Sequence, residues 1–564
     1  ISASLRSPRE TASARPARSG GGGGGDRGGA EPGASAAYNR AVEVPLTPLE
    51  FLRRARSLYA SGTAVVDGER RWTYEQLADR CARWSGALQR LGIERGDRVA
   101  YIAPNTHATL ESFYAVPQIG AVLVPINFRL SPEEFTYIVN HSGARVVCAA
   151  EPHTGQVEAI RPDLKTVEHF VSLDGARAGW LDYEAALAEA PAAFAAAPPS
   201  ERDLLTINYT SGTTARPKGV MITHRNAWMN AVGTLVHVHM TSGDRYLWTL
   251  PMFHANGWTF TWIVTAVGGT HICLRRPDPA QVFELVRREG VTMLCAAPTV
   301  LISLAHAPAA ARRGVPRGVR VLTAGAPPAA ATIDAIEEGL GWSVTHVYGL
   351  TETAPFISIC EPRPGHDRLS PAARSAIKAR QGVELVTSGE LKVVAEDGRE
   401  VPHDGQTTGE IVVRGNVVME GYFNDPEATR ACMGDGWFHS GDAAVVHPDG
   451  YVEIRDRLKD VIISGGENIS SVEVEAMLLR HPAVQEAAVV GLPDVRWGEA
   501  PHAFVVLKSG AAASAGELRE FSRAHLAHFK TPHSFTFVAD LPKTATGKIQ
   551  KYVLRGRRAN LAPQ

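Results

Sequence analysis

The amino-acid sequence predicts an α/β protein with a large N-terminal domain, in which helices cover parallel sheets, and a small α+β domain at the C-terminus. The first observation is an alternation of amphipathic helices with short apolar strands between Thr73 and Tyr348, a pattern typical of parallel sheets covered on both faces. The second is a change at Gly382 to short strands separated by turns. We therefore expect domains at 41–458, with a β-rich subdomain at about 382–455, and at 459–564.

Each element of the alternation has a local signal. Capping-box patterns at Thr73–Gln76 and Ser131–Glu134 predict the starts of two helices, because the first hydroxyl and the later amide or carboxylate satisfy exposed backbone amides. Apolar runs bounded by polar residues, glycine or proline predict the buried strands. The expected strands are 99–103, 121–125, 146–149, 246–250, 271–274, 293–296, 319–323 and 343–348, and further helices are expected at 108–119, 279–289 and 330–340.

Length and composition set limits on function. With 564 residues, 44% of them apolar, the chain can bury large cores. Its net charge of −1 argues against nucleic acid or a membrane surface as a partner. No run approaches the ~20 apolar residues that cross a bilayer. The six cysteines stand singly, so we expect buried, unreactive thiols in a reducing, cytoplasmic compartment.

Residues 1–40 differ in composition from the rest of the chain. They contain six consecutive glycines at Gly20–Gly25, together with six arginines and three acids. Such a segment buries too little apolar surface to fold, and we interpret it as a disordered tail or a misplaced start. The alternative is a transit peptide, because an Arg- and Ser-rich, acid-poor leader is typical of mitochondrial targeting.

The stretch Tyr209–Gly219, YTSGTTARPKG, predicts a ligand site. It places five hydroxyl residues, two glycines and Lys218 between two apolar runs, which indicates a strand, a tight loop and a second strand. Hydroxyls and backbone amides can donate to anionic oxygens, and glycine permits close approach, so a polyphosphate would fit. The common P-loop differs, because here Gly219 follows Lys218 and no helix start is evident. A polar surface loop is the alternative interpretation.

Five motifs together resemble the adenylate-forming superfamily of acyl-CoA synthetases, luciferases and peptide-synthetase adenylation domains. The resemblance spans about Tyr38 to Arg557. The motifs are YTSGTTARPKGV at 209–220, YGLTET at 348–353, GWFHSGD at 436–442, DRLKDVIISGGENISSVEVE at 456–475 and PKTATGKIQK at 542–551. One such match would be weak, whereas five in the expected order are specific.

The resemblance implies an ATP site with Mg²⁺. Tyr348 would stack on adenine, Thr351 would contact the α-phosphate, and Glu352 would hold Mg²⁺, which usually binds one carboxylate plus phosphate oxygens. Asp442 would accept hydrogen bonds from the ribose, and Arg457 would be a second ribose or phosphate contact. The remaining ATP-binding residues implied by the motifs are Thr210, Ser211, Gly212, Thr213, Thr214, Lys218, Gly325, Ala326 and Gly349. Ordinary turns are the alternative for Gly325–Ala326 and for Asp442.

The resemblance also implies a C-terminal domain that rotates between two half-reactions. Lys459 falls at the hinge position, and hinges absorb large backbone changes at a few residues. Lys548 resembles the lysine that stabilises charge developing at the reacting oxygens. The composition of the surrounding segment, taken alone, would suggest only an exposed lysine. Ser464, Gly465 and Gly466 would face the site in the second state, where glycines leave room for the pantetheine arm of coenzyme A.

The acyl pocket is predicted from LPMFHANGWTF at 250–260. His254 could lie near the substrate carboxylate, although a lone histidine in an apolar run is often a packed core residue. Trp258 is bulky and would shorten the pocket. Amino-acid-activating relatives carry an aspartate near His254 and Ala255, so an α-amino acid is not expected. The pattern is most similar to enzymes for short- and medium-chain or aromatic acids.

We therefore expect an ATP- and Mg²⁺-dependent acyl-CoA synthetase that forms an acyl-adenylate and transfers the acyl group to coenzyme A. Three alternatives remain: a ligase that loads the thiol of a carrier protein, a luciferase-like oxygenase and a non-catalytic nucleotide-binding protein. The last would be expected to lack Lys548 or Glu352, and both are present. Oligomeric state is left open.

Overall fold

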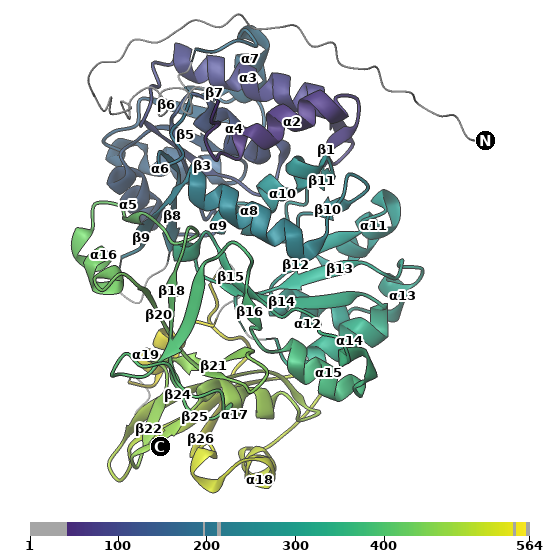
Figure 1. The fold of residues 1–564 in the computed structure, drawn as a ribbon, viewed down its shortest axis with the longest axis vertical. Helices are drawn as coiled ribbons and strands as arrows, with labels where there is room; N and C mark the ends of the chain where they lie inside the picture. The colour runs from purple at the N-terminus through teal and green to yellow at the C-terminus, as the bar shows by residue number, and fades with distance from the viewer. Residues whose placement is uncertain (1–41, 196–197, 211–215, 327, 545–548, 560–564) are drawn as a thin grey trace, which may run out of the picture. The chain divides into compact units, whose positions relative to one another are not determined.

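The computed structural model describes residues 42–195, 198–210, 216–326, 328–544 and 549–559. Residues 45–564 form one compact unit. Across the described residues, two large mixed sheets, a four-stranded sheet and a five-stranded sheet form the frame (Figure 1). The α/β prediction is confirmed, together with the β-rich part and the small C-terminal sheet.

The first large sheet contains the strands that end at the predicted nucleotide site. Its inner strands are parallel, and antiparallel hairpins close both edges. In spatial order it consists of β16 (Val383–Glu384), β15 (Phe356–Ile359), β14 (Ser343–Gly349), β13 (Arg320–Thr323), β12 (Met293–Ala296), β10 (Arg245–Leu247), β11 (Thr270–Ile272), β1 (Thr63–Asp67) and β2 (Arg70–Thr73).

The second large sheet contains the strands on either side of the predicted phosphate loop. It consists of β19 (Gly421–Tyr422), β9 (Lys218–Thr223), β8 (Leu204–Thr210), β4 (Val122–Ile126), β3 (Arg98–Ile102), β5 (Ala144–Ala149), β6 (His169–Ser172) and β7 (Leu181–Asp182). β8 and β9 pair antiparallel, with Thr210 opposite Lys218. The two predicted strands are therefore present, while residues 211–215 between them lie outside the described residues.

Helices cover both large sheets. They are α2 (Leu49–Tyr59), α3 (Tyr74–Arg90), α4 (His107–Gln118), α5 (Pro132–Ser142), α6 (His153–Ile160), α7 (Tyr183–Glu189), α8 (His224–Val238), α10 (Phe260–Val267), α11 (Pro279–Glu289), α12 (Pro298–Ala305), α13 (Ala309–Arg312), α14 (Ala330–Leu340) and α15 (Pro371–Lys378). The predicted capping boxes at Thr73 and Ser131 are both formed.

Helix α8 lies between the two large sheets in Figure 1. It packs on β8 and β9, and its Asn230 donates to the carbonyl of Phe356 in β15 at 2.7 Å. A strand, β9, and no helix starts at Lys218, as the sequence indicated, and α8 begins only after that strand, at His224. Thr223 and Asn226 form its capping box, a signal that the sequence contains but that we did not weigh.

The β-rich part and the C-terminal part complete the frame. The first contains β17 (Glu390–Val394), β18 (Gly409–Arg414), β20 (Phe438–Val446), β21 (Val452–Arg457) and α16 (Pro426–Met433). The second contains β23 (Glu467–Ile469), β22 (Ile462–Ser464), β25 (Gly498–Leu507), β24 (Val484–Asp494) and β26 (Ser534–Phe537), with α17 (Ser471–Leu478), α18 (Ala515–His525) and α19 (Lys551–Ala559).

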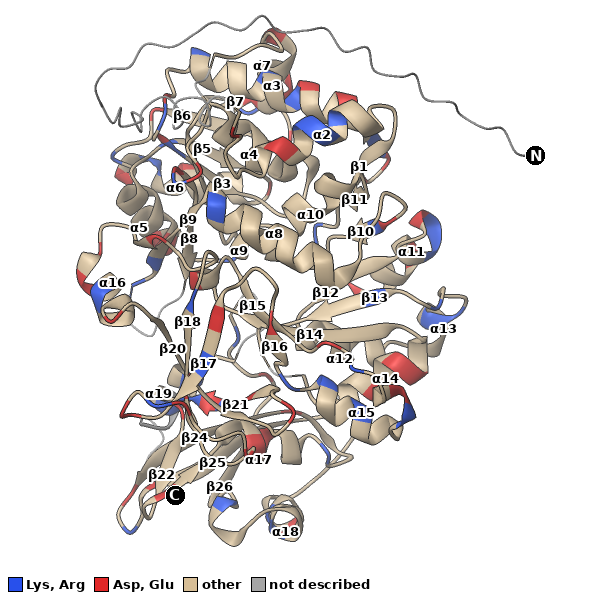
Figure 2. Cartoon of the chain, viewed as in Figure 1, with Lys and Arg blue, Asp and Glu red and all other residues tan. Residues whose placement is uncertain are grey.

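Buried side chains and surface charges agree with the composition. One apolar cluster runs from the helices over β3 through both large sheets to the β-rich part. Figure 2 shows acidic and basic residues interspersed over helices and loops, as the net charge of −1 suggests. Five cysteines are buried as expected, but Cys432 is only half-buried. No helix in the described ranges is long and apolar enough to cross a bilayer.

Candidate active site

Tyr348, Asp442 and Arg457 form one hydrogen-bonded group. Tyr348 lies near the end of β14, while Asp442 in β20 stands opposite Arg457 in β21. The Tyr348 hydroxyl donates to Asp442 Oδ2 at 2.6 Å, and Arg457 Nε lies 2.7 Å from Asp442 Oδ1. The sequence predicted all three residues, and the structure brings them together from separate strands.

The charges in this group are fixed by burial and by one another. Burial, reinforced by the Asp442 carboxylate, raises the pKa of Tyr348 well above its usual range, so the phenol remains a donor. Burial alone would lower the pKa of Arg457, but the carboxylates of Asp442 and Glu352 help to raise it. A carboxylate can accept about four hydrogen bonds, and Asp442 accepts two, from Tyr348 and from Arg457. Acceptor capacity therefore remains for a ligand diol.

Glu352 lies in a short 3₁₀ turn, η2 (Thr351–Thr353), directly after β14. Its Oε1 accepts a hydrogen bond from the Tyr422 hydroxyl at 2.9 Å. Lys218, at the start of β9, places its ammonium 4.7 Å from the centre of the Tyr422 ring. A carboxylate, a phenol and an ammonium from three different segments thus lie in one group.

Gly349 is required by packing against the neighbouring strand. A Cβ at this position would lie 1.9 Å from the backbone oxygen of Pro355, far inside contact distance. A glycine therefore lets the chain turn from β14 into η2, where Thr351 and Glu352 follow. Its predicted place in the nucleotide motif has this local structural reason.

The phosphate loop itself lies largely outside the described residues. Ser211, Gly212, Thr213 and Thr214 belong to that part, as does Lys548. Thr210 is the last residue of β8 and lies opposite Lys218. Just before it, Tyr209 shares a 2.7 Å hydrogen bond with His141 Nδ1 of α5, which fixes the end of β8.

Gly325 and Ala326 follow β13, on the strand next to β14. Gly325 has a φ of 90°, which favours glycine, and apart from its chain neighbours no atom of a described residue lies within 4 Å of a Cβ built there. The backbone at this turn is therefore open to close approach by another group. The geometry fits a loop beside the Tyr348 strand end, where α/β sheets commonly bind ligands.

His254 directly precedes a left-handed turn that contains Trp258. Ala255, Asn256, Gly257, Trp258 and Thr259 all have φ between 35° and 65°, a conformation that costs L-residues energy. Trp258 is buried and packs edge-on against Phe356, with ring centres 5.7 Å apart. The ring centres of His254 and Trp258 are 6.5 Å apart.

Buried amides hold the left-handed turn in place. Asn208 in β8 donates to the carbonyl of Phe253 at 3.0 Å and to Asn256 Oδ1 at 3.2 Å. Asn256 in turn donates to Thr206 Oγ1 at 3.0 Å. The strand that leads into the phosphate loop therefore also fixes the segment with His254 and Trp258.

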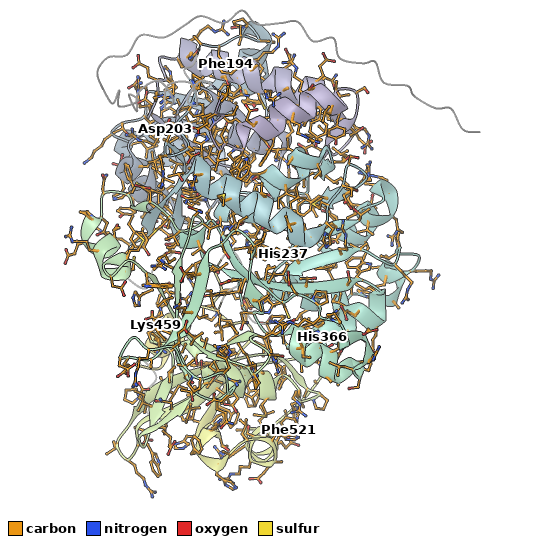
Figure 3. All side chains as sticks on the ribbon, viewed as in Figure 1. Phe194, Asp203, His237, His366, Lys459 and Phe521 are labelled. Atoms are coloured by element: carbon orange, nitrogen blue, oxygen red, sulfur yellow. The ribbon has the colours of Figure 1, made fainter. Side chains whose placement is uncertain are left out.

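The hinge candidate Lys459 lies on the turn between β21 and β22 and is labelled in Figure 3. Its neighbour Asp460 pairs with Arg555 of α19 at 2.8 Å. Three residues beyond Lys548, Lys551 is half-buried, with 12% of its side chain exposed, and pairs with Glu475 of α17 at 2.8 Å.

Ser464, Gly465 and Gly466 form the turn of the β22–β23 hairpin. Gly465 donates its amide to the Trp497 carbonyl at 2.8 Å, and a Cβ on it would lie 2.8 Å from the indole. The glycine thus makes room for Trp497 in this structure. Among described residues, no hydrogen bond or ion pair joins this turn to Tyr348, Asp442 or Glu352.

The donor set around Glu352 fits a magnesium ion carried by a nucleotide. Mg²⁺ demands oxygen ligands and commonly takes one or two carboxylates together with substrate phosphates. Tyr422 occupies only Oε1 of Glu352. Within the described ranges no cluster of three or more potential metal ligands occurs, so an ion at Glu352 would depend on phosphate oxygens.

Tyr422 is the functional residue that sequence reasoning missed. It contacts Glu352 from a position 70 residues away, and it lies outside the five motifs that indicated the site. Asn208 was missed for a related reason, because its partners lie 45 and 48 positions away. Neither separation leaves a local pattern.

Comparison with known proteins agrees with the geometry. Residues 52–423 match the family described as AMP-binding enzyme, and residues 473–548 match the AMP-binding enzyme C-terminal domain. A 4-hydroxybutyrate–CoA ligase of Metallosphaera sedula is 43% identical over 519 residues, which cover 90% of this chain and 94% of the relative. An acetate–CoA ligase of Humulus lupulus is 42% identical over 545 residues, which cover 92% and 96%.

A solved structure extends the match to three dimensions. The anthranilate CoA ligase in complex with anthranoyl-AMP superposes with a TM-score of 0.82 at 27% identity, over 92% of this chain and 98% of that one. The chain therefore belongs to the family of AMP-binding, adenylate-forming enzymes, in its branch of acyl-CoA synthetases and acyl-activating enzymes.

Proposed function

We propose that the protein is an ATP- and Mg²⁺-dependent acid–CoA ligase that works through an acyl-adenylate. The observation that carries the proposal is the assembly, around the end of β14, of the Tyr348–Asp442–Arg457 group and the Glu352 turn. An aromatic ring, a carboxylate with spare acceptors and a second carboxylate suit the base, the ribose and a metal-bound phosphate of one nucleotide. The relatives named as CoA ligases support the same reaction.

In the first half-reaction the substrate carboxylate oxygen attacks the α-phosphorus of ATP. The new P–O bond forms as the bond to the β-phosphate breaks, which releases pyrophosphate. Tyr348 would pack on adenine, Asp442 and Arg457 would hold the ribose, and Thr351 would contact the α-phosphate. Lys218, with Thr210 and the hydroxyls of 211–214, would hold the departing phosphates. Mg²⁺ at Glu352 would supply charge neutralisation on the phosphate oxygens.

Lys548 is proposed as the cation that stabilises charge developing between the carboxylate and the α-phosphate. In the second half-reaction the thiol of coenzyme A, as thiolate, attacks the acyl carbonyl and AMP leaves. Ser464–Gly466 would then line the path of the pantetheine arm, after rotation about Lys459. The turn position of Lys459, between β21 and β22, is compatible with that role.

We infer a short- to medium-chain or aromatic acid as the substrate. The buried Trp258, held against Phe356, occupies volume beside His254. The relatives already named act on acetate and 4-hydroxybutyrate, and the solved relative acts on anthranilate. These are small acids, which is the common point that supports a short pocket here.

A substrate panel tests the proposal. Pyrophosphate release is measured with ATP, Mg²⁺ and coenzyme A across acetate to palmitate, with benzoate and cinnamate, and thioester products are identified by mass. We expect AMP and acyl-CoA in equal amounts, with the highest kcat/KM among the small acids. Turnover that needs a carrier-protein thiol, or that yields no thioester, would overturn the assignment of coenzyme A as acceptor.

A further inference from the structure

A short segment, 419–423, joins the phosphate-loop strand to the Glu352 turn. The Met419 amide donates to the carbonyl of Glu352 at 2.8 Å. The Glu420 amide donates to the carbonyl of Met221 at 3.0 Å, and the Phe423 amide donates to that of Gly219 at 2.7 Å. The backbone of this segment therefore fixes the distance between β9, where Lys218 begins the strand, and η2.

The side chain of Tyr422, in the middle of this segment, contacts both charged residues. Its hydroxyl donates to Glu352 Oε1 at 2.9 Å, and the Lys218 ammonium lies 4.7 Å from its ring centre. A phenol is neutral near pH 7, because its ordinary pKa is about 10, so the hydroxyl can donate to the carboxylate. The Tyr422 amide donates to Thr429 Oγ1 at 2.9 Å, which fixes its backbone.

We propose that Tyr422 is a positioning residue that holds Glu352 and Lys218 in separate places and thereby sets the affinity for the magnesium–nucleotide complex. This inference rests on the proposed function. A lysine and a glutamate in one site attract each other, and a direct ion pair would neutralise the carboxylate needed by a divalent cation. A neutral phenol that binds the carboxylate at Oε1, and the ammonium on its ring face, leaves Glu352 Oε2 available.

Two substitutions separate the hydroxyl from the ring. Tyr422→Phe keeps the ring beneath Lys218 and removes the bond to Glu352, whereas Tyr422→Leu removes both. The affinity for α,β-methylene-ATP, which cannot be cleaved at the reacting bond, is measured by calorimetry with saturating Mg²⁺ and again with EDTA. For Tyr422→Phe we expect binding about tenfold weaker with Mg²⁺ but changed by less than about twofold with EDTA, as for loss of one hydrogen bond to a charged group.

Tyr422→Leu is expected to weaken binding under both conditions, because Lys218 also loses its support. Glu352→Gln in the Tyr422→Phe background checks that the hydroxyl acts through Glu352, since the double variant should bind no more weakly than Glu352→Gln alone. Tyr451→Phe is the matched control. It removes a buried hydroxyl bonded to the carbonyl of Glu361, and neither affinity should change. Melting curves verify that each variant folds.

The outcomes separate this inference from the proposed function. If the wild type shows no Mg²⁺-dependent binding of the analogue, the proposed function fails and this inference with it. If the wild type binds as expected, then wild-type affinity in Tyr422→Phe, or an equal loss with Mg²⁺ and with EDTA, overturns the inference alone. A Mg²⁺-specific loss in Tyr422→Phe that disappears in the Glu352→Gln background supports it.

Discussion

Asp442→Asn should weaken nucleotide binding strongly while changing the shape of the site little. Asp442 is 5% exposed and accepts hydrogen bonds from Tyr348 at 2.6 Å and from Arg457 at 2.7 Å. Asparagine keeps the size of the side chain but offers only one acceptor oxygen. Its NH₂ group would face either the guanidinium, which can only donate, or the phenol, which could accept only by turning its own proton away.

The magnitude follows from these two contacts. A hydrogen bond to a charged group contributes about 1.5–3 kcal/mol. The amide oxygen can keep one contact, so the free energy of unfolding should fall by about 2–3 kcal/mol, with Arg457 left short of a partner. The single oxygen then has less capacity for a ribose diol, and loss of a further ~2 kcal/mol would raise the Kd for ATP about 30-fold.

Calorimetry with α,β-methylene-ATP measures the Kd, and denaturant titration measures stability. Asp244→Asn is the matched control, because Asp244 is a 10% exposed carboxylate paired with Arg320 before β10. It should lose stability and keep the wild-type Kd. An unchanged Kd in Asp442→Asn, or an equal rise of the Kd in both variants, would refute the assignment of Asp442 to the ribose.

Three further predictions concern other parts of the chain. Lys548→Ala should nearly abolish acid-dependent pyrophosphate release while the thiol step on supplied acyl-AMP largely survives; equal loss of both rates would contradict its role. Trp258→Ala should raise kcat/KM for longer acids about fourfold per added methylene, because burying one CH₂ contributes ~0.8 kcal/mol. An unchanged substrate profile would contradict the assignment of Trp258 to the acyl pocket. Burial would lower the pKa of His107, but hydrogen bonds to Asp67 and Glu184 raise it above 6.5. Its stabilising contribution is therefore full below pH 6.5 and lost as the pH rises through the higher value. His107→Gln should lower the unfolding midpoint more at pH 5.5 than at pH 9. His346→Gln should do the opposite, because burial lowers the pKa of His346 to about 4, so that at pH 5.5 the unfolded chain binds a proton there that the folded chain does not. Shifts of the same size at both pH values in both variants would contradict this.

The helices and strands that were predicted correctly have signals within a few neighbouring residues of the sequence. The capping boxes at Thr73 and Ser131 lie within four residues, and both form. Helices 279–289 and 330–340 and the strand 293–296 match the structure residue for residue. The antiparallel edges, such as β1 with β2, were not predicted, because nothing local distinguishes an edge hairpin from two more strands of a parallel sheet.

The predictable part of the site consisted of residues within contiguous motifs. Tyr348, Asp442 and Arg457 were recognised separately, and folding placed them in mutual contact. Tyr422 was not recognised, because its bond to Glu352 is created by the pairing of β19 with β9. The left-handed turn at Ala255–Thr259 was also missed. Only one of its five residues is glycine, and buried amides such as Asn208 hold it.

ATP–pyrophosphate exchange in the absence of coenzyme A tests the central claim most directly. Labelled pyrophosphate is supplied with ATP, Mg²⁺ and a small acid, and label entering ATP is counted. An enzyme that forms an acyl-adenylate should catalyse exchange that requires the acid and does not require coenzyme A, and adding coenzyme A should then yield AMP and thioester. Exchange that needs no acid, or the release of ADP and phosphate instead, would contradict the account.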